Sequence, residues 1–333
     1  MKIVITGIAG LLGSNLATYL LENTNHEVVG IDNLSCGLLS NVPTDMKCYW
    51  STIGCNVCDE IFEAEQPDIV YHFAAYAAEC LSPFIRSYNY TNNLVATAEI
   101  VTACIKYNVQ RLVFTSSIGV YGRNLSPYVE HNIPNPIDPY GVAKFACELD
   151  IRIAQEQHGL EYCILRPHNV YGPHQVITQK YRNVFGIWLD RLQHGLPLQI
   201  YGDGKQRRAF SFIGDMMHPL HMAGVSPTAK NQTINLGGST PISIEEAARF
   251  FIAQRGGDLM YCAPRHEIKD AWCTVNKSQR LLGYADKTSL ADGLAAMWRW
   301  AETADHTCAE PPTVELSVGL PVYWQPTVLT NKY

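Results

Sequence analysis

A tyrosine and a lysine that could move a proton lie four residues apart in the stretch DPYGVAKFACE, residues 138–148. Pro139 predicts a helix start, and the spacing then puts Tyr140 and Lys144 on one face of the helix, one turn apart. A free phenol has a pKa near 10 and is a poor base at neutral pH, but a neighbouring ammonium group favours the phenolate. The pair could therefore act as a general acid and base, although the same spacing also arises by chance.

A glycine-rich segment near the N-terminus, TGIAGLLGS, could hold a dinucleotide. It places Gly7, Gly10 and Gly13 between an apolar, strand-like run and a helical pattern. Glycines there let the backbone turn tightly and approach a pyrophosphate, and the helix start offers free N–H groups and the positive end of its dipole. Asp32 follows at the end of the next predicted strand. A carboxylate at that point can accept hydrogen bonds from both ribose hydroxyls and would repel a 2′-phosphate, which favours NAD over NADP.

The elements that must position these motifs alternate between strand and helix through the first half of the chain. Apolar runs of strand length occur in KIVITG, HEVVGIDN, DIVYHFAA, RLVFTSS and YCILRP, with helical stretches between them, among them residues 90–107 and 140–158. This order predicts a parallel sheet covered by helices on both faces, which is a doubly wound α/β fold of the Rossmann type.

The composition of the chain changes after about residue 166: Pro, Gly, Gln and Arg become frequent, and the predicted loops become longer. We therefore expect residues 1–166 to form an NAD-binding Rossmann domain and residues 167–333 to form a smaller mixed α/β domain for the substrate. Late segments within about 209–240, among them QTINLGG, are expected to rejoin the main sheet.

Composition restricts the classes of function. The chain has 333 residues and a net charge of −6, without a basic block, which argues against nucleic acid and anionic membranes as partners. Apolar runs are too short for a membrane span, and a strand begins directly at the N-terminus without a signal peptide, so we expect a cytoplasmic protein. The eleven cysteines are scattered. Only Cys55 and Cys58 form a close pair, so we expect reduced cysteines and no metal site.

The chain resembles the extended short-chain dehydrogenase/reductase family in the segments TGIAGLLGS, HFAA, TSSIGVYG, YGVAK, RPHNVYGP and YGDGKQRRAFSFIGD. Within that family it is most similar to the UDP-glucose 4-epimerase group. The resemblance implies an NAD-dependent epimerase that inverts C4 of a UDP-sugar, UDP-glucose or UDP-galactose first, through a transient 4-keto intermediate. Tyr140 would be the acid and base, Lys144 would favour its phenolate and hold the nicotinamide ribose, and Ser117 would hydrogen-bond the reacting sugar oxygen.

The resemblance also implies binding residues and a partner. The cofactor set is Gly7, Gly10, Leu11, Leu12, Gly13, Asp32, Asn33, Phe73, Ala74, Ala75, Asn92, Tyr140, Lys144 and Pro167. The substrate set is Ser117, Asn169, Asn183, Val184, Gln199, Tyr201, Arg208 and Arg265, in which the two arginines would pair with the diphosphate and Gln199 and Tyr201 would flank the uracil. Helices near 91–107 and 140–158 would pair with their symmetry mates as the four-helix bundle of a homodimer.

Other reactions of the same family stay open. Nucleotide-sugar 4,6-dehydratases carry Asp-Glu where this chain has Ile118 and Gly119 after Ser117, and neither residue can move a proton, which disfavours elimination. A UDP-N-acetylglucosamine or UDP-glucuronate 4-epimerase, a dehydratase and a catalytically silent NAD-binding protein remain alternatives. Cys80 is interpreted as a packing or lining residue.

The chain departs from the family pattern at one site, and at a second site its alignment with the family allows two residues. The aspartate that usually follows the third strand and binds adenine is replaced by Ser51 and Thr52. The position that limits the substituent at sugar C2 falls on Ala271, which would admit an N-acetyl group, or on Trp272, which would exclude it.

Overall fold

Seven parallel strands form the central sheet of the computed structural model, which describes residues 1–179, 181–265, 267–321 and 324. The strands lie in the order β11-β6-β5-β4-β1-β2-β3. Their bounds are β1 Lys2–Thr6, β2 Glu27–Asp32, β3 Lys47–Trp50, β4 Ile69–His72, β5 Arg111–Thr115, β6 Glu161–Pro167 and β11 Gln232–Leu236. The predicted Rossmann-type sheet is confirmed. The segment QTINLGG supplies β11, which pairs with β6 in parallel.

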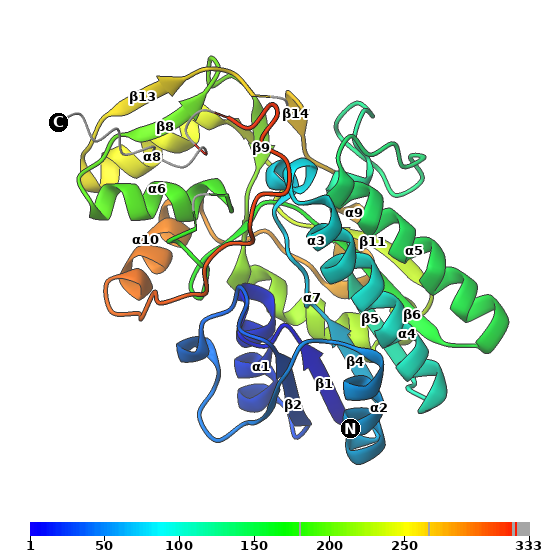
Figure 1. Cartoon of the computed structure of the whole chain (residues 1–333). Helices are drawn as coiled ribbons and strands as arrows, with labels where there is room; N and C mark the ends of the chain where they lie inside the picture. The colour runs from blue at the N-terminus through cyan, green and yellow to red at the C-terminus, as the bar shows by residue number, and fades with distance from the viewer. Residues whose placement is uncertain (180, 266, 322–323, 325–333) are drawn as a thin grey trace.

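Helices cover both faces of this sheet, which explains why its strands are apolar without alternation. Along β1, Ile3 and Ile5 belong to one core cluster and Val4 to the other. The first cluster packs under α1 Leu11–Asn23, α7 Ile213–Val225 and α9 Asn276–Leu282, and the second under α2 Cys55–Glu65, α4 Ala96–Lys106 and α5 Pro139–His158. Figure 1 shows α4 and α5 side by side on the outer face of the sheet.

The helix expected from residue 90 begins earlier and is not uniform. It starts as α3 Arg86–Tyr90, continues through a π-helical turn at Thr91–Val95, and then becomes α4. Such turns widen a helix locally and are frequent at functional sites. Asn92 lies in this turn and lines the large cavity described below.

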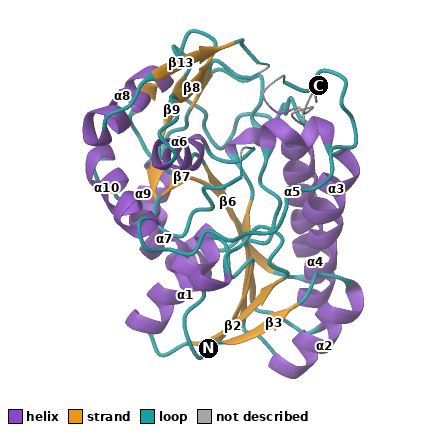
Figure 2. Ribbon diagram, turned by 60° about the vertical axis from the view of Figure 1, so that its left-hand side comes forward, coloured by secondary structure: helices purple, strands orange, loops and turns teal. Residues whose placement is uncertain are grey.

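A smaller mixed layer lies over the carboxyl ends of the main strands (Figure 2). It contains the helices α6 Val184–Gln193, α8 Ile244–Arg255 and α10 Leu290–Ala301 around a core that includes Phe185, Trp188 and Phe251. Three short sheets belong to it: β8 Leu198–Tyr201 with β13 Leu259–Cys262; β9 Arg207–Ala209 with β12 Pro241–Ser243 and β14 Asp270–Ala271; and β7 Val170–Tyr171 with β10 Ser211–Phe212.

The strand order of the main sheet determines where a ligand can enter. From β1 the chain moves outward to β2 and β3, and it then crosses back to β4 on the other side of β1. At such a reversal the loops after neighbouring strands separate and leave a crevice at the carboxyl edge. Among the described helices, none combines the length and the apolar character that crossing a bilayer requires.

Candidate functional site

A large cavity opens at this crevice, between the carboxyl ends of the main strands and the smaller layer. Its volume is about 1190 Å³, and drug-sized ligands commonly occupy pockets of roughly 300–1,000 Å³. The cavity therefore has room for an extended dinucleotide with a second ligand beside it. All of the residues predicted to bind a cofactor or a substrate line this one cavity.

The glycine loop lies at the floor of the cavity and fits the role predicted for it. Gly7 has a φ of +72°, and a Cβ there would lie 2.7 Å from the backbone nitrogen of Ala74. A Cβ on Gly13 would overlap the carbonyl oxygen of Gly7, so the first turn of α1 can approach the loop only because this residue is glycine. Gly10 precedes α1, and the backbone at the start of this helix borders the cavity. The loop thus forms a cradle in which backbone N–H groups can face an anion.

Asp32 ends β2 and is held in place by two backbone donors. Its Oδ2 accepts a hydrogen bond from the N–H of Ala9 at 2.9 Å, and its Oδ1 accepts one from Leu34 at 2.7 Å. Each carboxylate oxygen keeps a further lone pair for a ligand. Burial raises the pKa of Asp32, and the backbone hydrogen bonds oppose that shift.

Hydroxyl groups border the cavity next to Asp32, at the departure from the usual adenine-binding pattern. Ser51 and Thr52 follow β3 and both line the cavity. Asn33 donates a hydrogen bond of 3.2 Å to the Thr52 hydroxyl, which fixes the two loops against each other. Amide and hydroxyl groups are thus available at this end of the cavity.

Tyr140 and Lys144 lie where the helix start predicted them. Asp138 caps α5, accepting a hydrogen bond of 2.8 Å from the N–H of Gly141, and Pro139 is the first helical residue. The buried Tyr140 hydroxyl is hydrogen-bonded to Ser117, which begins the loop after β5. Lys144 is buried one turn further along, with its ammonium group 5.8 Å from the centre of the Tyr140 ring. The three residues named as catalytic therefore share one wall of the cavity.

Several charged and polar side chains act on the pKa of the Tyr140 hydroxyl. Burial raises its pKa, and the charges of Glu79 and Asp138 raise it further. The groups that lower the pKa are Arg182 and the Ser117 hydroxyl. The role of Lys144 in favouring the phenolate stays a prediction. Burial also lowers the pKa of Lys144, to about 8.

The two arginines predicted to bind a diphosphate both line the cavity, but their side chains contact different groups of the protein. Arg208 donates to the carbonyl oxygens of Lys269, at 3.0 Å, and Ile268, at 2.7 Å, and pairs with Glu267 at 3.3 Å. The guanidinium of Arg265 lies 4.5 Å from the centre of the Tyr201 ring, and its buried Nε has no partner among the described residues. Arg265 thus keeps a donor free for a ligand.

The remaining substrate candidates have part of their bonding capacity in use. Asn183 caps α6, accepting from the N–H of Phe185 at 3.1 Å, while its Nδ2 donates to the carbonyl oxygen of Val170 at 2.7 Å. The Nδ2 of Asn169 donates to the carbonyl oxygen of Ala209 at 2.9 Å. We therefore assign the side chain of Asn183 chiefly to positioning the start of α6.

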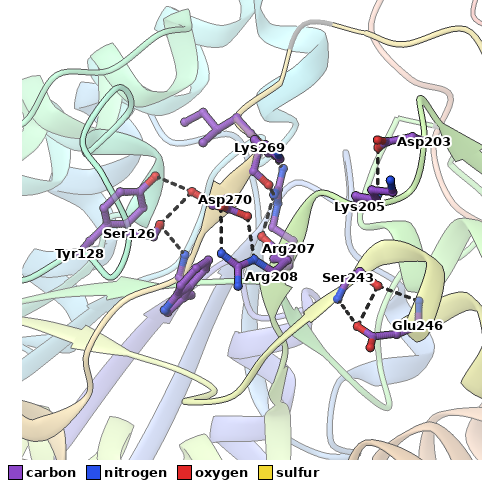
Figure 3. Close-up of polar contacts among 12 residues, drawn as sticks. Ser126, Tyr128, Asp203, Lys205, Arg207, Arg208, Ser243, Glu246, Lys269 and Asp270 are labelled. Atoms are coloured by element: carbon purple, nitrogen blue, oxygen red, sulfur yellow. Dashed lines mark hydrogen bonds and ion pairs between the residues drawn. The ribbon is translucent and has the colours of Figure 1, made fainter.

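Ala271 and Trp272, the two candidates for the position that limits the C2 substituent, lie differently relative to the cavity. This residue lines the cavity. The Trp272 ring lies 4.8 Å from the guanidinium of Arg207. Figure 3 shows that guanidinium against the carboxylate of Asp270, with N–O distances of 3.0 and 3.1 Å. Ala271 is thus the candidate that borders the cavity, and its role as the limiting position stays a prediction.

Sequence reasoning missed several polar residues of the cavity, among them Glu79, Asp138, Arg182 and Gln175. Both polar atoms of the buried Gln175 amide lack a partner among the described residues. Glu79 follows the segment HFAAYAA, and its Oε1 would lie 3.7 Å from a Cβ on Gly119. Ile118 and Gly119 themselves cannot move a proton, but Glu79 brings a carboxyl group beside Gly119 from a different loop.

Histidines and cysteines of the described residues form no group of three or more that could hold a metal ion, whether alone or with acidic side chains. His168 is buried and bonds through Nε2 to the carbonyl oxygen of Gly238 at 2.9 Å. Cys80 lines the cavity, and burial raises the pKa of its thiol to about 11, which keeps it protonated at neutral pH.

Known proteins that resemble this chain share its fold, and several of them are named for reactions on nucleotide sugars. Residues 3–237 match the model of the NAD-dependent epimerase/dehydratase family. The UDP-glucose 4-epimerase of Thermotoga maritima, solved with UDP-glucose, superposes with a TM-score of 0.86 at 28% identity, over 91% of this chain and 99% of that one.

Two further relatives are named for another substrate or another reaction. The UDP-glucuronic acid 4-epimerase of Bacillus cereus, solved with UDP-glucuronic acid and NAD, has a TM-score of 0.83 at 27% identity, over 91% of this chain and 99% of its own. The dTDP-D-glucose 4,6-dehydratase of Mus musculus is 30% identical over 261 residues, which are 75% of this chain and 72% of that protein. The family match covers well over half of the sequence and confirms the predicted NAD-dependent enzyme of the epimerase type: the chain belongs to the NAD-dependent epimerase/dehydratase family.

Proposed function

We propose that this enzyme inverts C4 of a UDP-sugar through a 4-keto intermediate, with UDP-glucose and UDP-galactose as the first substrate pair. One observation carries the proposal: the Tyr140 hydroxyl, bonded to Ser117, lies in the same cavity as the glycine loop and Asp32. A proton acceptor for a sugar hydroxyl and a cradle for a dinucleotide are thus combined in one space. The relatives named for 4-epimerase activity support this reading.

The cavity fits NAD by its shape and its polar groups. The cradle at Gly7 and Gly13 has no room for side chains, as a close pyrophosphate requires. Asp32 would bind the adenosine ribose, Ser51 or Thr52 would border the adenine, and Lys144 would hold the nicotinamide ribose. The Ser116 hydroxyl, buried in the cavity wall without a partner among the described residues, is available to the same ligand. When bound, NAD supplies the acceptor for a hydride from C4.

The residues of the chain then hold and move one proton. Tyr140 takes it from the C4 hydroxyl of the sugar and later returns it, while Ser117 orients that oxygen. Because burial raises the pKa of Tyr140, the phenolate depends on positive charge in the filled cavity. Lys144, whose pKa is about 8, is cationic at neutral pH and contributes part of that charge.

The polar groups around the sugar end of the cavity favour a neutral hexose. The carboxyl groups of Glu79 and Asp138 line this part, and a carboxylate at sugar C6 would be repelled by them. Arg208 and Arg265 remain the candidates for the diphosphate, and Gln199 and Tyr201 for the uracil. We therefore place UDP-hexoses ahead of UDP-glucuronate.

A second candidate substrate follows from Ala271. The methyl group of this residue leaves space that a large side chain would fill, so an N-acetyl group at C2 can be accommodated. UDP-N-acetylglucosamine is thus the alternative that a specific observation favours.

A homodimer through helices α4 and α5 is part of the proposal. Val95 and the α5 residues Val142, Leu149 and Ile153 are apolar and exposed, and the spacing of the three α5 residues puts them along one side of the helix. An exposed apolar stripe on α5, with the exposed Val95 in the turn directly before α4, suits pairing with a second copy in a four-helix bundle.

The decisive experiment is an activity panel on purified protein with its bound cofactor. UDP-glucose, UDP-N-acetylglucosamine and UDP-glucuronate are incubated separately without added reductant, and products are identified by NMR. We expect UDP-glucose to yield UDP-galactose, and Tyr140→Phe to abolish the conversion while NAD stays bound. Unchanged sugars across the panel would contradict the proposal, and so would a deoxy keto sugar as the product, since that would indicate a dehydratase.

A further inference from the structure

A pair of carboxyl groups lies beside the proposed acid–base tyrosine without a role in the reaction described so far. Glu79 begins the helical turn Glu79–Phe84 after β4, and Asp138 precedes α5. The two side chains are hydrogen-bonded to each other, so they share a proton between them. Asp138 also accepts from the N–H of Gly141, which holds its carboxyl in place at the start of α5.

The pair borders the same small space as Ser117. A Cβ on Gly119 would lie 3.3 Å from the Ser117 hydroxyl oxygen and 3.7 Å from Glu79 Oε1. No side chain of residue 119 therefore separates the oxygen that orients the sugar from the carboxyl of Glu79. Glu79 is surrounded by protein but keeps accessible surface and lines the cavity, so a ligand held by Ser117 can meet it.

The charges around Glu79 keep it able to give or take a proton near neutral pH. Burial raises its pKa to about 7, the charge of Asp138 and the hydrogen bond to Asp138 act in the same direction, and Arg208 and Arg265 oppose them. Other titratable groups that interact with Glu79 are Cys80 on its own turn, Tyr128 and Tyr140. A carboxyl group of this kind is half protonated at the working pH of most enzymes, which suits general acid–base catalysis.

We propose that Glu79 is a second catalytic acid and base, which removes and returns a proton on a ring carbon next to the C4 ketone. This inference rests on the proposed function, because a 4-keto sugar is what acidifies the C–H bonds at C3 and C5. The Glu79 carboxylate takes the proton, the C–H electron pair becomes the C=C bond of an enolate, and the ketone electrons move onto O4. Tyr140 and Ser117 stabilise that oxygen by hydrogen bonding.

The step is balanced without an additional reactant. Return of the proton from Glu79 restores the ketone, with no change in oxidation state. Asp138 passes protons between Glu79 and the solvent-filled cavity, so the proton that returns can come from water. Delivery to the opposite face would invert a second centre, and delivery to the same face would give exchange only.

The test supplies a ready-made ketone to the enzyme with NAD⁺ bound. UDP-4-keto-6-deoxyglucose cannot be oxidised at C4, so incubation in D₂O isolates the proton transfer. We expect deuterium at C3 or C5, seen by NMR as loss of that proton signal and by mass as a gain of one unit. Glu79→Gln keeps the size of the side chain and is expected to slow exchange about 100-fold or more. Glu63→Gln, which replaces an exposed glutamate on α2, is the matched control and should exchange at the wild-type rate.

A second variant guards against a purely structural effect. Asp138→Asn keeps a residue able to cap α5 but removes the charge and the acidic partner of Glu79. The pKa of Glu79 should then fall, and the rise of the exchange rate with pH should move to lower pH, which loss of folding would not produce. Retention of NAD, measured by absorbance after denaturation, verifies that each variant is folded.

The outcomes separate this inference from the proposed function. Exchange by the wild type no faster than in buffer alone, or equally fast exchange by Glu79→Gln, overturns the role of Glu79, even if UDP-glucose is epimerised. Exchange that depends on Glu79, with no inversion of any UDP-hexose at C4, would support the second acid and base but refute C4 epimerisation.

Discussion

Lys144 donates a hydrogen bond of 2.8 Å to the carbonyl oxygen of Thr115, the last residue of β5. The bond connects α5 to the sheet directly beside the loop that carries Ser117. The ammonium group of Lys144 also lies 4.8 Å from the centre of the Phe114 ring. The lysine is thus fixed in a buried position by the strand, and its distance from Tyr140 is set by packing rather than by a direct bond between the two side chains.

Replacement of this lysine is expected to impair catalysis in a pH-dependent way. Burial lowers the pKa of Lys144 to about 8, so the ammonium form is present below that pH and is lost above it. The rate of C4 inversion should therefore fall as pH rises through about 8, and Lys144→Met should reduce it about 100-fold throughout. Lys144→Arg keeps its charge to higher pH and should move the fall upward. A wild-type profile that is flat from pH 7 to 10 would contradict the role of the ammonium group.

Asp32 is predicted to determine the choice of dinucleotide. Asp32→Ser removes the carboxylate but keeps a small polar group beside the N–H of Ala9. We expect the dissociation constant for NAD to rise about tenfold or more, which corresponds to loss of about 1.4 kcal/mol, and NADP to bind better than it does to the wild type. Titration of protein fluorescence with each dinucleotide measures both effects. Asp258→Asn, on a loop outside the cavity, is the control, and equal losses in the two variants would argue against a specific contact.

The nucleotide-binding half of the site was accessible to sequence reasoning because its signals are local. The glycine loop, the end of β2 and the start of α5 each depend on a few neighbouring residues, and all are confirmed in position. The seven-stranded sheet followed from apolar runs buried on both faces. The start of α3 at Arg86 escaped because a short helix, a π-helical turn and α4 follow one another there and leave no single periodicity.

The sugar end of the site was less accessible because it is assembled from distant segments. Glu79, Gly119 and Asp138 come from three loops, and nothing in the sequence near any of them indicates the others. Arg182 directly precedes Asn183, which was predicted in its place and whose side chain serves mainly as a helix cap. An acidic residue directly after an apolar strand and an alanine-rich turn was the signal that could have directed attention to Glu79.

A charge cluster at the edge of the sheet should make the protein sensitive to acid. Glu65, at the end of α2, bonds to Lys2 of β1 at 3.1 Å and also to Lys47 and Tyr49 of β3. These hydrogen bonds outweigh the effect of burial and lower the pKa of Glu65 to about 2. Because the folded pKa lies below the unfolded one, this stabilisation is complete above about pH 4.5 and is lost as pH falls towards 2.

Glu65→Gln is therefore expected to reduce the free energy of unfolding by about 1–3 kcal/mol at pH 7. The difference from the wild type should shrink below pH 4.5, as urea titrations at several pH values would show. Glu63→Gln on the same helix should leave stability unchanged. Since β3 leads into Ser51 and Thr52, weaker NAD binding by Glu65→Gln is a further expected result. A constant difference across the whole pH range would refute the assignment.

The exposed face of α5 is predicted to mediate dimer formation. Leu149→Glu places a charge in the apolar stripe and should convert the protein to a monomer in sedimentation velocity. Leu196→Glu is the matched control, because Leu196 is equally exposed but lies in the loop before β8, away from α4 and α5. If both variants remain dimers, or if the wild type is a monomer at micromolar concentration, the four-helix bundle is not the interface.

The size of the residue at position 271 is expected to decide between substrates. Ala271 lies on β14, beside Arg208 of β9, and it lines the cavity. Ala271→Tyr fills that space with a phenol, which should reduce kcat/KM for UDP-N-acetylglucosamine by about tenfold or more, while UDP-glucose is affected little. The ratio of the two kcat/KM values is the measurement, because a general loss of folding would lower both. Trp272→Phe, where the native ring stacks on Arg207, should leave the ratio unchanged. If Ala271→Tyr also leaves it unchanged, the C2 substituent lies elsewhere in the cavity, and the preference must be sought among the residues around Asn169.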